Sequence, residues 1–264
     1  MSSRRGRSIS SLVLFATAMN ACTWTSADHP KRSAAVTTKA SALTVYEAPT
    51  PRFRVPRYNT SGTYPQVRRD DIDLRAVNAA LRRVVLEDQQ RYAPSARAAA
   101  KVAGKNAWGV YQTSVDRRLL SASTVVVSVL MPATELYPGG TEGSGWVAGT
   151  VRVPSGAGVR LTDLFARPAR ALPVLAREWK AQFRRTNPRM WVCVTQLPSV
   201  VSPSASNYRY FALLPQGLAV GFYGHASCAG FQATVPYARL RPYLSRLGAT
   251  LIAGVRPAQK AVSS

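Results

Sequence analysis

The stretch LLSASTVVVSVLM, residues 119–131, decides which class of fold this chain can adopt. Its β-branched residues predict a strand. Segments of the same character flank it, WGVYQTSVD at 108–116 and GWVAGTVRVP at 145–154. The glycine-rich connection YPGGTEGSG, residues 137–145, predicts a short turn before the last of these strands. Together the segments predict an antiparallel meander with short turns.

A first helix is predicted before the meander. Its apolar positions recur at helical spacing and are Leu74, Val77, Leu81 and Val84 or Val85. Asp71 or Asp73 is suited to cap the start of this helix. Further upstream, residues 41–67 mix β-favouring residues with proline and glycine. This composition predicts an early strand followed by a long irregular connection.

A second helix is predicted at residues 173–185. One face of it is apolar and carries Leu172, Leu175, Trp179 and Phe183. Another face carries Arg177, Lys180 and Arg184, which we call the basic stripe. Such a row of positive charges is either a solvated helix face or a contact surface for a polyanion.

The last third of the chain predicts more strands. They lie at 190–197, 208–215 and 218–224, and the PQG sequence at 215–217 forms a hairpin turn between the last two. Residues 237–247 predict a helix interrupted at Pro242, and residues 247–264 predict a tail. The elements together predict an α+β fold with two main helices packed on the sheet.

The composition excludes some classes of protein. The chain has 264 residues of which 46% are hydrophobic, which is enough to bury an ordinary core. It carries 35 Lys and Arg against 12 Asp and Glu, and every charged residue after Glu178 is basic. Such a field attracts polyanions. Nucleic acid is not the expected partner, because no zinc-finger spacing, recognition helix or RNA-binding motif accompanies the charge.

The N-terminal sequence MSSRRGRSISSLVLFATAMNAC, residues 1–22, has the form of an export signal. Arginines precede a short apolar run at 12–19, which is too short to span a bilayer comfortably. Two processing routes are open, lipidation of Cys22 as in bacterial lipoproteins or cleavage after Ala18. We favour lipidation, because an unpaired thiol is unusual in an exported protein. Residues 23–41 then form a flexible spacer.

The other two cysteines form an even pair. With Cys22 lipidated, Cys193 and Cys228 would be oxidised to a disulfide in an exported protein. Free buried thiols and a zinc site that includes His225 are the alternatives. The zinc site lacks a fourth ligand among the few nearby acids, so we expect neither a metal nor any other cofactor.

Several short motifs follow one another in an order that is similar to a known family. They are YPQV at 64–67, NAAL at 78–81, YPGG at 137–140, GVRLTDLF at 158–165, YFALLPQGLAVGF at 210–222 and VPYARLRPYL at 235–244. In this order they resemble the RsiV-like domain family, domain of unknown function 3298, which occurs in exported actinobacterial lipoproteins and secreted antigens. The resemblance covers residues 41–246.

The resemblance implies an exported α+β domain whose helices pack on a curved antiparallel sheet, usually without catalytic activity. This sequence departs from the family pattern after the YPGG motif, where Thr141 and Glu142 replace a frequent histidine. It also places Cys228 in a family turn, which favours the disulfide.

Catalytic motifs are weak in this chain. The GSG sequence at 143–145 is not the nucleophile elbow of serine hydrolases. Glu135 and Glu142 flank one turn, so they are the one carboxylate pair with a geometry suited to glycosidase chemistry. Two acids on the surface of a turn are the simpler interpretation, and we predict no catalytic residue.

We therefore predict a monomeric, exported, membrane-tethered domain that binds the cell envelope. Its partner is expected to be an anionic wall polymer or membrane surface, or a glycan or protein. The predicted parts are a signal peptide at 1–22, a spacer at 23–41, the domain at 42–246 and a tail at 247–264. The predicted contact residues are Tyr137, Gly139, Gly140, Glu142, Trp146, Arg177, Lys180 and Arg184. The alternative is an enzyme or accessory domain that processes wall polysaccharide.

Overall fold

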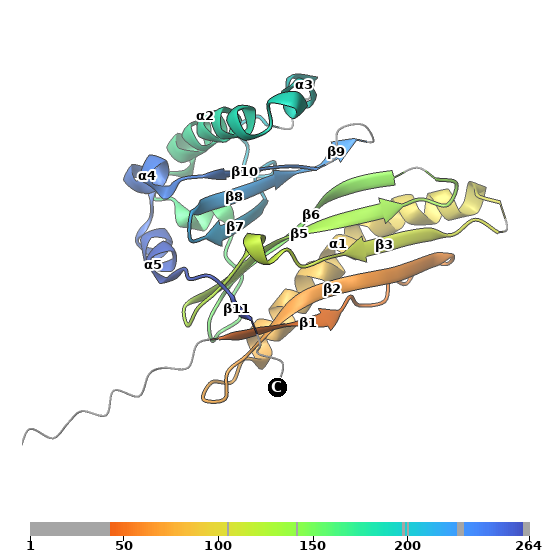
Figure 1. Cartoon of the computed structure of the whole chain (residues 1–264), viewed down its shortest axis with the longest axis horizontal. Helices are drawn as coiled ribbons and strands as arrows, with labels where there is room; N and C mark the ends of the chain where they lie inside the picture. The colour runs from red at the N-terminus through yellow and green to blue at the C-terminus, as the bar shows by residue number, and fades with distance from the viewer. Residues whose placement is uncertain are drawn as a thin grey trace, which may run out of the picture. The chain divides into compact units, whose positions relative to one another are not determined.

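The computed structural model describes residues 43–104, 106–140, 142–196, 199, 201–225 and 230–260. The predicted signal peptide with Cys22, the predicted spacer and Cys228 lie outside these described residues. The described chain contains two β-sheets together with helices (Figure 1). The predicted α+β class is confirmed.

The larger sheet has eight strands within the described residues. In order across the sheet these are β11 (Gln259–Lys260), β1 (Thr44–Pro49), β2 (Tyr58–Arg68), β3 (Gly109–Thr113), β5 (Val126–Leu136), β6 (Glu142–Arg152) and β9 (Gly224–His225). The short strand β4 (Leu120–Ala122) pairs with β5 outside this order. The antiparallel meander predicted from the sequence is the run β3, β5 and β6.

The hairpin of β5 and β6 lies at the centre of this meander. Its register runs from Val126 opposite Arg152 to Leu136 opposite Glu142. The turn passes through Gly139 and Gly140, whose φ angles of 105° and 96° lie in the region that favours glycine. The glycines of the predicted turn are therefore needed for its backbone conformation.

Two strand pairs in the larger sheet are parallel, so the sheet is mixed and not purely antiparallel as predicted. β2 pairs in parallel with β3, and helix α1 (Arg75–Val102) connects them. β1 pairs in parallel with β11 from the end of the chain. Parallel neighbours require a long crossover, which α1 supplies for the first pair.

In the part of the chain that the structure describes, the smaller sheet has three strands, in the order β10 (Phe231–Val235), β8 (Gly217–Phe222) and β7 (Tyr210–Leu214). The predicted hairpin turn is present, because Leu214 pairs with Gly217 across it. Helix α2 (Pro168–Thr186) covers this sheet, where Trp179 packs edge-on to Phe222. The Trp179 indole also donates a hydrogen bond to the carbonyl of Val220.

Strand β5 lies between two cores. Val127 and Val129 belong to a core shared with α1, whereas Leu130 belongs to a core shared with the smaller sheet. Successive side chains of a strand project to opposite faces, which explains why this segment is apolar throughout. The layers of the domain are thus α1, the larger sheet, the smaller sheet and α2 (Figure 1).

The two predicted helical stripes are present. In α1 the side chains of Val77, Leu81 and Val85 are buried, and the Asp73 carboxylate accepts a hydrogen bond from the backbone N–H of Arg75. In α2 the predicted apolar residues are all buried. The helix begins at Pro168, earlier than predicted. Proline is favoured at the first helical position, because the backbone N–H that it lacks would have no hydrogen-bond partner within the helix.

The strand predicted at residues 190–197 is wrong. The 3-10 turn η3 (Pro188–Met190) leads directly into the short helix α3 (Trp191–Gln196). A short apolar run does not distinguish a strand from a helical turn. Here Pro188 starts a helical turn.

The tail predicted after residue 246 is also wrong. Helix α5 (Arg246–Gly254) buries Leu251, and the Ser245 hydroxyl caps it by accepting from the N–H of Gly248. β11 follows and pairs with β1, so the folded part continues beyond the predicted boundary. The remaining short elements are η1 (Arg117–Leu119), η2 (Leu161–Leu164), α4 (Tyr237–Leu240) and η4 (Arg241–Tyr243). None of the helices in the described ranges is long and apolar enough to cross a membrane.

Candidate functional site

The predicted contact turn contains both exposed and core residues. Gly139, Gly140 and Glu142 are exposed, and Tyr137 is half-buried with its ring centroid 5.2 Å from that of Tyr92. Trp146 is only 9% exposed and belongs to the core between the two sheets. The prediction that Trp146 is a contact residue is wrong, because the smaller sheet covers it.

The basic stripe lies on α2, which is a different element from the β5–β6 hairpin that carries the predicted contact turn. Arg177 and Arg184 are exposed and Lys180 is half-buried. Arg177 pairs with Glu178 at 3.2 Å. The guanidinium of Arg184 lies 5.8 Å from the centroid of the Trp191 ring. Two of the three side chains of the stripe, Arg177 and Arg184, therefore already interact with neighbouring residues of the chain.

The carboxylate pair considered for glycosidase chemistry does not form. Glu135 lies opposite Gly143, and Leu136 lies opposite Glu142. Residues opposite each other on paired strands project to the same face of a sheet, and adjacent residues project to opposite faces. Glu135 and Glu142 therefore project to opposite faces of the hairpin.

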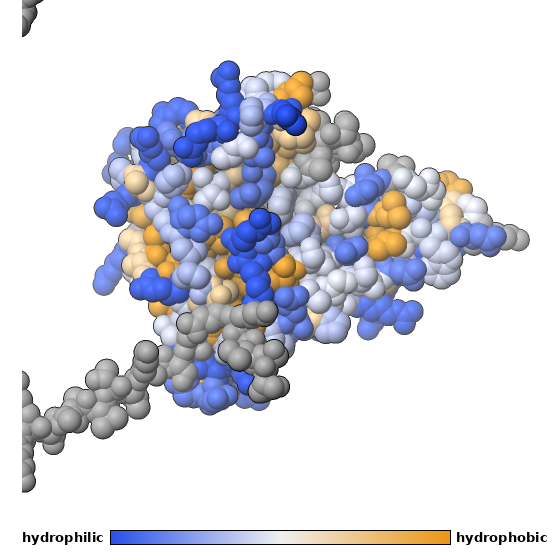
Figure 2. All heavy atoms as spheres, in the orientation of Figure 1, coloured by the Kyte–Doolittle hydropathy of each residue, from blue (hydrophilic) through white to orange (hydrophobic). Residues whose placement is uncertain are grey.

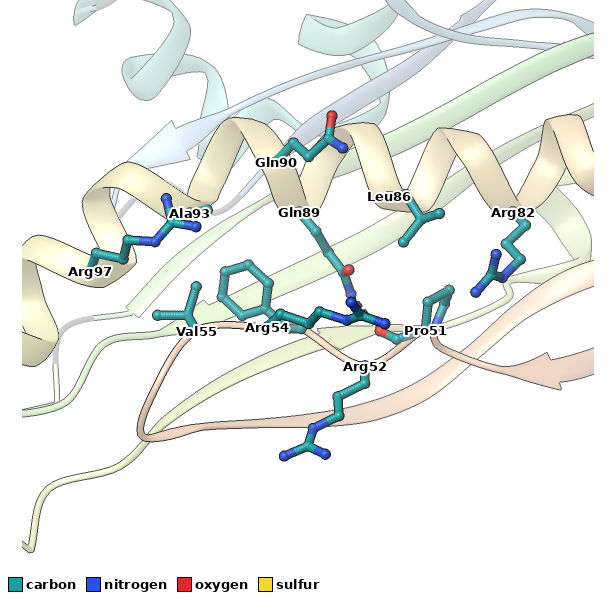
Figure 3. A pocket seen from close by; sticks show the side chains of 11 residues that line it. Pro51, Arg52, Arg54, Val55, Arg82, Leu86, Gln89, Gln90, Ala93 and Arg97 are labelled. Atoms are coloured by element: carbon teal, nitrogen blue, oxygen red, sulfur yellow. Dashed lines mark hydrogen bonds between the residues drawn. The ribbon is translucent and has the colours of Figure 1, made fainter.

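A different surface gathers positive charge. The connection from β1 to β2 lies over one side of α1 and leaves a groove of about 480 Å³, which we call the basic groove (Figure 3). Its arginines are Arg52, Arg54, Arg82 and Arg97. Its other side chains include Phe53, Leu86, Gln89 and Gln90. No carboxylate is among the described residues that line it.

Local contacts hold this connection against α1. The amide of Gln89, on α1, donates a hydrogen bond of 2.6 Å to the carbonyl of Pro51. The Phe53 ring is buried and packs edge-on to Tyr58 and against Tyr111. The groove is thus a built feature of the domain and does not depend on the arginine side chains for its shape.

The four arginines of the groove have no ion-pair partner in the part of the chain that the structure describes. All four are exposed. Arg54 and Arg82 extend over the groove in Figure 3, whereas Arg52 extends away from the helix. Charges of one sign beside an apolar wall focus the field and attract anions.

A second site lies on another side of α1, where the helix meets β5, β7 and the end of β8. It is a cavity of about 240 Å³, which we call the tyrosine–carboxylate cavity. Its acids are Asp88 and Glu135, and its arginines are Arg91 and Arg209. Its tyrosines are Tyr92, Tyr210 and Tyr223.

The acids in this cavity are buried and have unusual titration. Asp88 accepts hydrogen bonds of 2.9 Å from Arg91 and from the Tyr111 hydroxyl. Burial raises the pKa of Asp88 above its usual range. Glu135 accepts a 3.0 Å hydrogen bond from Tyr223. Burial, and then the nearby charge of Asp88, raise the pKa of Glu135 to about 7.

Sequence reasoning missed most of both sites. Arg52 and Arg54 lie in the segment predicted as an irregular connection, and only its density of arginine and proline marks it. Asp88 and Arg91 lie on α1 beyond the predicted stripe. Glu135 was singled out from the sequence, but with the wrong partner.

Comparisons with known proteins find similarity to solved structures. No protein-family model matches the chain, and a search of curated proteins found no match. Two solved structures with a similar fold are DUF3298 proteins. One, from Bacteroides fragilis, has 12% identity and a TM-score of 0.48, and the match covers 81% of this chain and 98% of that one. Another, from Pseudomonas aeruginosa, has 12% identity and a TM-score of 0.46, with 78% and 94% covered. Both belong to the family that the sequence motifs resemble.

Proposed function

We propose that this protein is an exported domain that binds an anionic polymer of the cell envelope through the basic groove. The observation that carries this proposal is the presence of four exposed arginines around one groove, without a carboxylate partner among the described residues. The formal net charge of +23 supports it, since the whole molecule attracts polyanions.

The spacing of the arginines favours a polymer over a single anion. Arg82 and Arg97 lie on the same helix, 15 positions apart. At about 1.5 Å per residue this separation is about 22 Å along the helix axis. One phosphate cannot contact both ends of such a row, but a chain of phosphates or carboxylates can.

The surface next to the groove adds an aromatic contact. Trp108 is 56% exposed and lies in a neighbouring hollow that shares Arg52 and Arg54 with the groove. On the face of the molecule shown in Figure 2, hydrophilic residues lie between apolar residues that form separate groups. A polar, charged partner suits the arginines of the groove and of the neighbouring hollow better than an apolar one.

The remaining parts of the proposal come from the sequence. The segment 1–22 directs export, and Cys22 carries the lipid that tethers the domain to the outer face of the membrane. Cys193, which is buried on α3, forms a disulfide with Cys228. The domain acts as a monomer. A lipid anchor would place the groove close to polymers of the wall.

Co-sedimentation with purified cell-wall sacculi tests the proposal. The chain from Thr23 onward is mixed with sacculi across a salt series, with and without their anionic polymers. Binding should weaken as salt rises, because each polymer charge that is neutralised releases a counterion. It should also be lost when the anionic polymers are removed.

Charge reversal then locates the contact. The double variant Arg54→Glu with Arg82→Glu should lose binding at physiological salt. The matched control is Arg83→Glu with Arg170→Glu, which changes the net charge equally at exposed positions outside the groove. Equal loss in the two double variants would show that only total charge matters and would refute the groove as the site.

A further inference from the structure

The tyrosine–carboxylate cavity is a built site that the basic groove does not include. Asp88 is 3% exposed and Glu135 is 5% exposed, so two acids are held away from water. Burying carboxylates costs free energy unless they are well paired. A fold that keeps two of them beside a cavity, and not in a packed core, has polar groups ready for a ligand.

The polar groups of the cavity are connected but not saturated. Arg91 donates to the Asp88 carboxylate at 2.9 Å and to the Tyr210 hydroxyl at 2.7 Å. Glu135 accepts a hydrogen bond only from Tyr223 among the described residues, although a carboxylate can accept about four. The Tyr92 hydroxyl is buried and has no hydrogen-bond partner in the described part of the chain. Glu135 and Tyr92 therefore leave hydrogen-bonding capacity at the cavity.

The charges around the cavity oppose each other, which limits the ligand. The arginines Arg91 and Arg209 would repel a cation, whereas Asp88, together with Glu135 when it is ionised, would repel an anion. A neutral ligand avoids both repulsions. A hydroxyl group can accept from an arginine and donate to a carboxylate, so a ligand with several hydroxyls can meet both kinds of group.

The size and the aromatic walls of the cavity also favour a small neutral ligand. Tyr210 and Tyr223 lie with ring centroids 5.6 Å apart and tilted by 56°, and the guanidinium of Arg209 lies 4.8 Å from the Tyr210 centroid. Aromatic side chains of this kind offer apolar faces with a polar edge. The volume of about 240 Å³ is below that of pockets for drug-sized ligands and suits one small ring.

We propose that the tyrosine–carboxylate cavity binds one neutral sugar residue through hydroxyl contacts to Glu135, Asp88 and the two arginines. The site is separate from the basic groove, because the two use different side chains of α1. A domain with both sites recognises a sugar unit and an adjacent anionic chain independently.

Protein-observed NMR titration tests this inference with the chain from Thr23 onward. The probes are glucose and N-acetylglucosamine as neutral sugars, inorganic phosphate as an anion, methylammonium as a cation and glycine as a zwitterion. At least one neutral sugar should saturate the protein in the millimolar range and shift signals of residues that line the cavity. The other three probes should not saturate the same signals.

Variants assign the contact. Glu135→Gln keeps the size of the side chain but removes its carboxyl group, and Arg209→Ala removes an exposed guanidinium that donates to the Tyr210 hydroxyl at 2.9 Å. Each should weaken sugar binding by about tenfold or more, which is the usual effect of losing a hydrogen bond to a charged group. The control is Tyr208→Phe, which removes a buried tyrosine hydroxyl bonded to Val201, away from the cavity.

Several outcomes would overturn the inference. These are no saturable binding of either sugar up to about 50 mM, saturation by phosphate, methylammonium or glycine in preference to sugar, or equal sugar affinity in wild type and both cavity variants. The groove variant Arg54→Glu with Arg82→Glu should retain sugar binding. Failure of the sugar site and failure of the polymer site are therefore distinguishable.

Discussion

The replacement Glu135→Gln should change how the stability of this domain depends on pH. The structure places Glu135 in a buried position, where desolvation and then Asp88 raise its pKa from the ordinary 4.5 to about 7. The neutral acid is favoured in the folded state, and the unfolded chain ionises more readily. The folded state therefore holds a proton over a pH range in which the unfolded state has released it.

The difference in the pKa of Glu135 between the folded and unfolded states sets the sign and size of the change in unfolding free energy with pH. Below pH 4.5 both states are protonated, and the stabilising effect of the raised pKa is fully present. As pH rises from 4.5 to 7, the free energy of unfolding falls by about 1.4 kcal/mol per pH unit, or about 3 kcal/mol in total. Above pH 7 the loss is complete. Gln at this position does not titrate and keeps an oxygen that accepts from Tyr223.

Denaturant unfolding measures the effect directly. The free energies of unfolding of wild type and Glu135→Gln are compared at several pH values between 4.5 and 7.5. The difference, variant minus wild type, should rise by about 3 kcal/mol across this range. Burial also raises the pKa of Asp88. The contributions of Asp88 and other titratable groups are present in both proteins and largely cancel when the free energy of unfolding of wild type is subtracted from that of the variant.

The matched control is Glu142→Gln, which changes an exposed glutamate on the opposite face of the same hairpin. Its unfolding free energy should follow that of wild type at every pH. Parallel curves for Glu135→Gln and wild type would refute the reasoning, because they would mean that Glu135 ionises in the folded state as it does in water.

Two further predictions concern residues that the sequence marked as contacts. Trp146→Ala should lower the free energy of unfolding by about 3–5 kcal/mol, because it empties a core position between the two sheets, and thermal or denaturant melts would measure it. A loss below about 1 kcal/mol would place the side chain at the surface. Arg177→Glu with Arg184→Glu should reduce sacculus binding less than the groove variant, because Arg177 already pairs with Glu178. A larger loss at the stripe would make α2 the principal contact.

Local patterns in the sequence were sufficient for several elements. The apolar stripe of α1, that of α2 and the glycines of the β5–β6 turn each predict their element correctly. These signals depend on residues three or four positions apart, or on one backbone conformation. These local patterns can be interpreted without knowing which distant segments of the chain pack against the element.

Short apolar segments were less informative. Residues 190–197 have the composition of a strand and form η3 and α3 instead. Residues 247–264 lack a long apolar pattern, yet they contain α5 and β11. In both cases packing against other elements decides the conformation, and composition alone does not record that packing.

Both candidate sites depend on contacts between distant parts of the chain. The sequence by itself determined the α+β class, the two helix stripes and the excess of positive charge. Only the tertiary structure brings Arg54 to Arg82 and Asp88 to Glu135, because a loop must fold over α1 and a helix must cross the sheet to do so. Strand register likewise separates Glu135 from Glu142 although they flank one turn, since adjacent strand positions project to opposite faces.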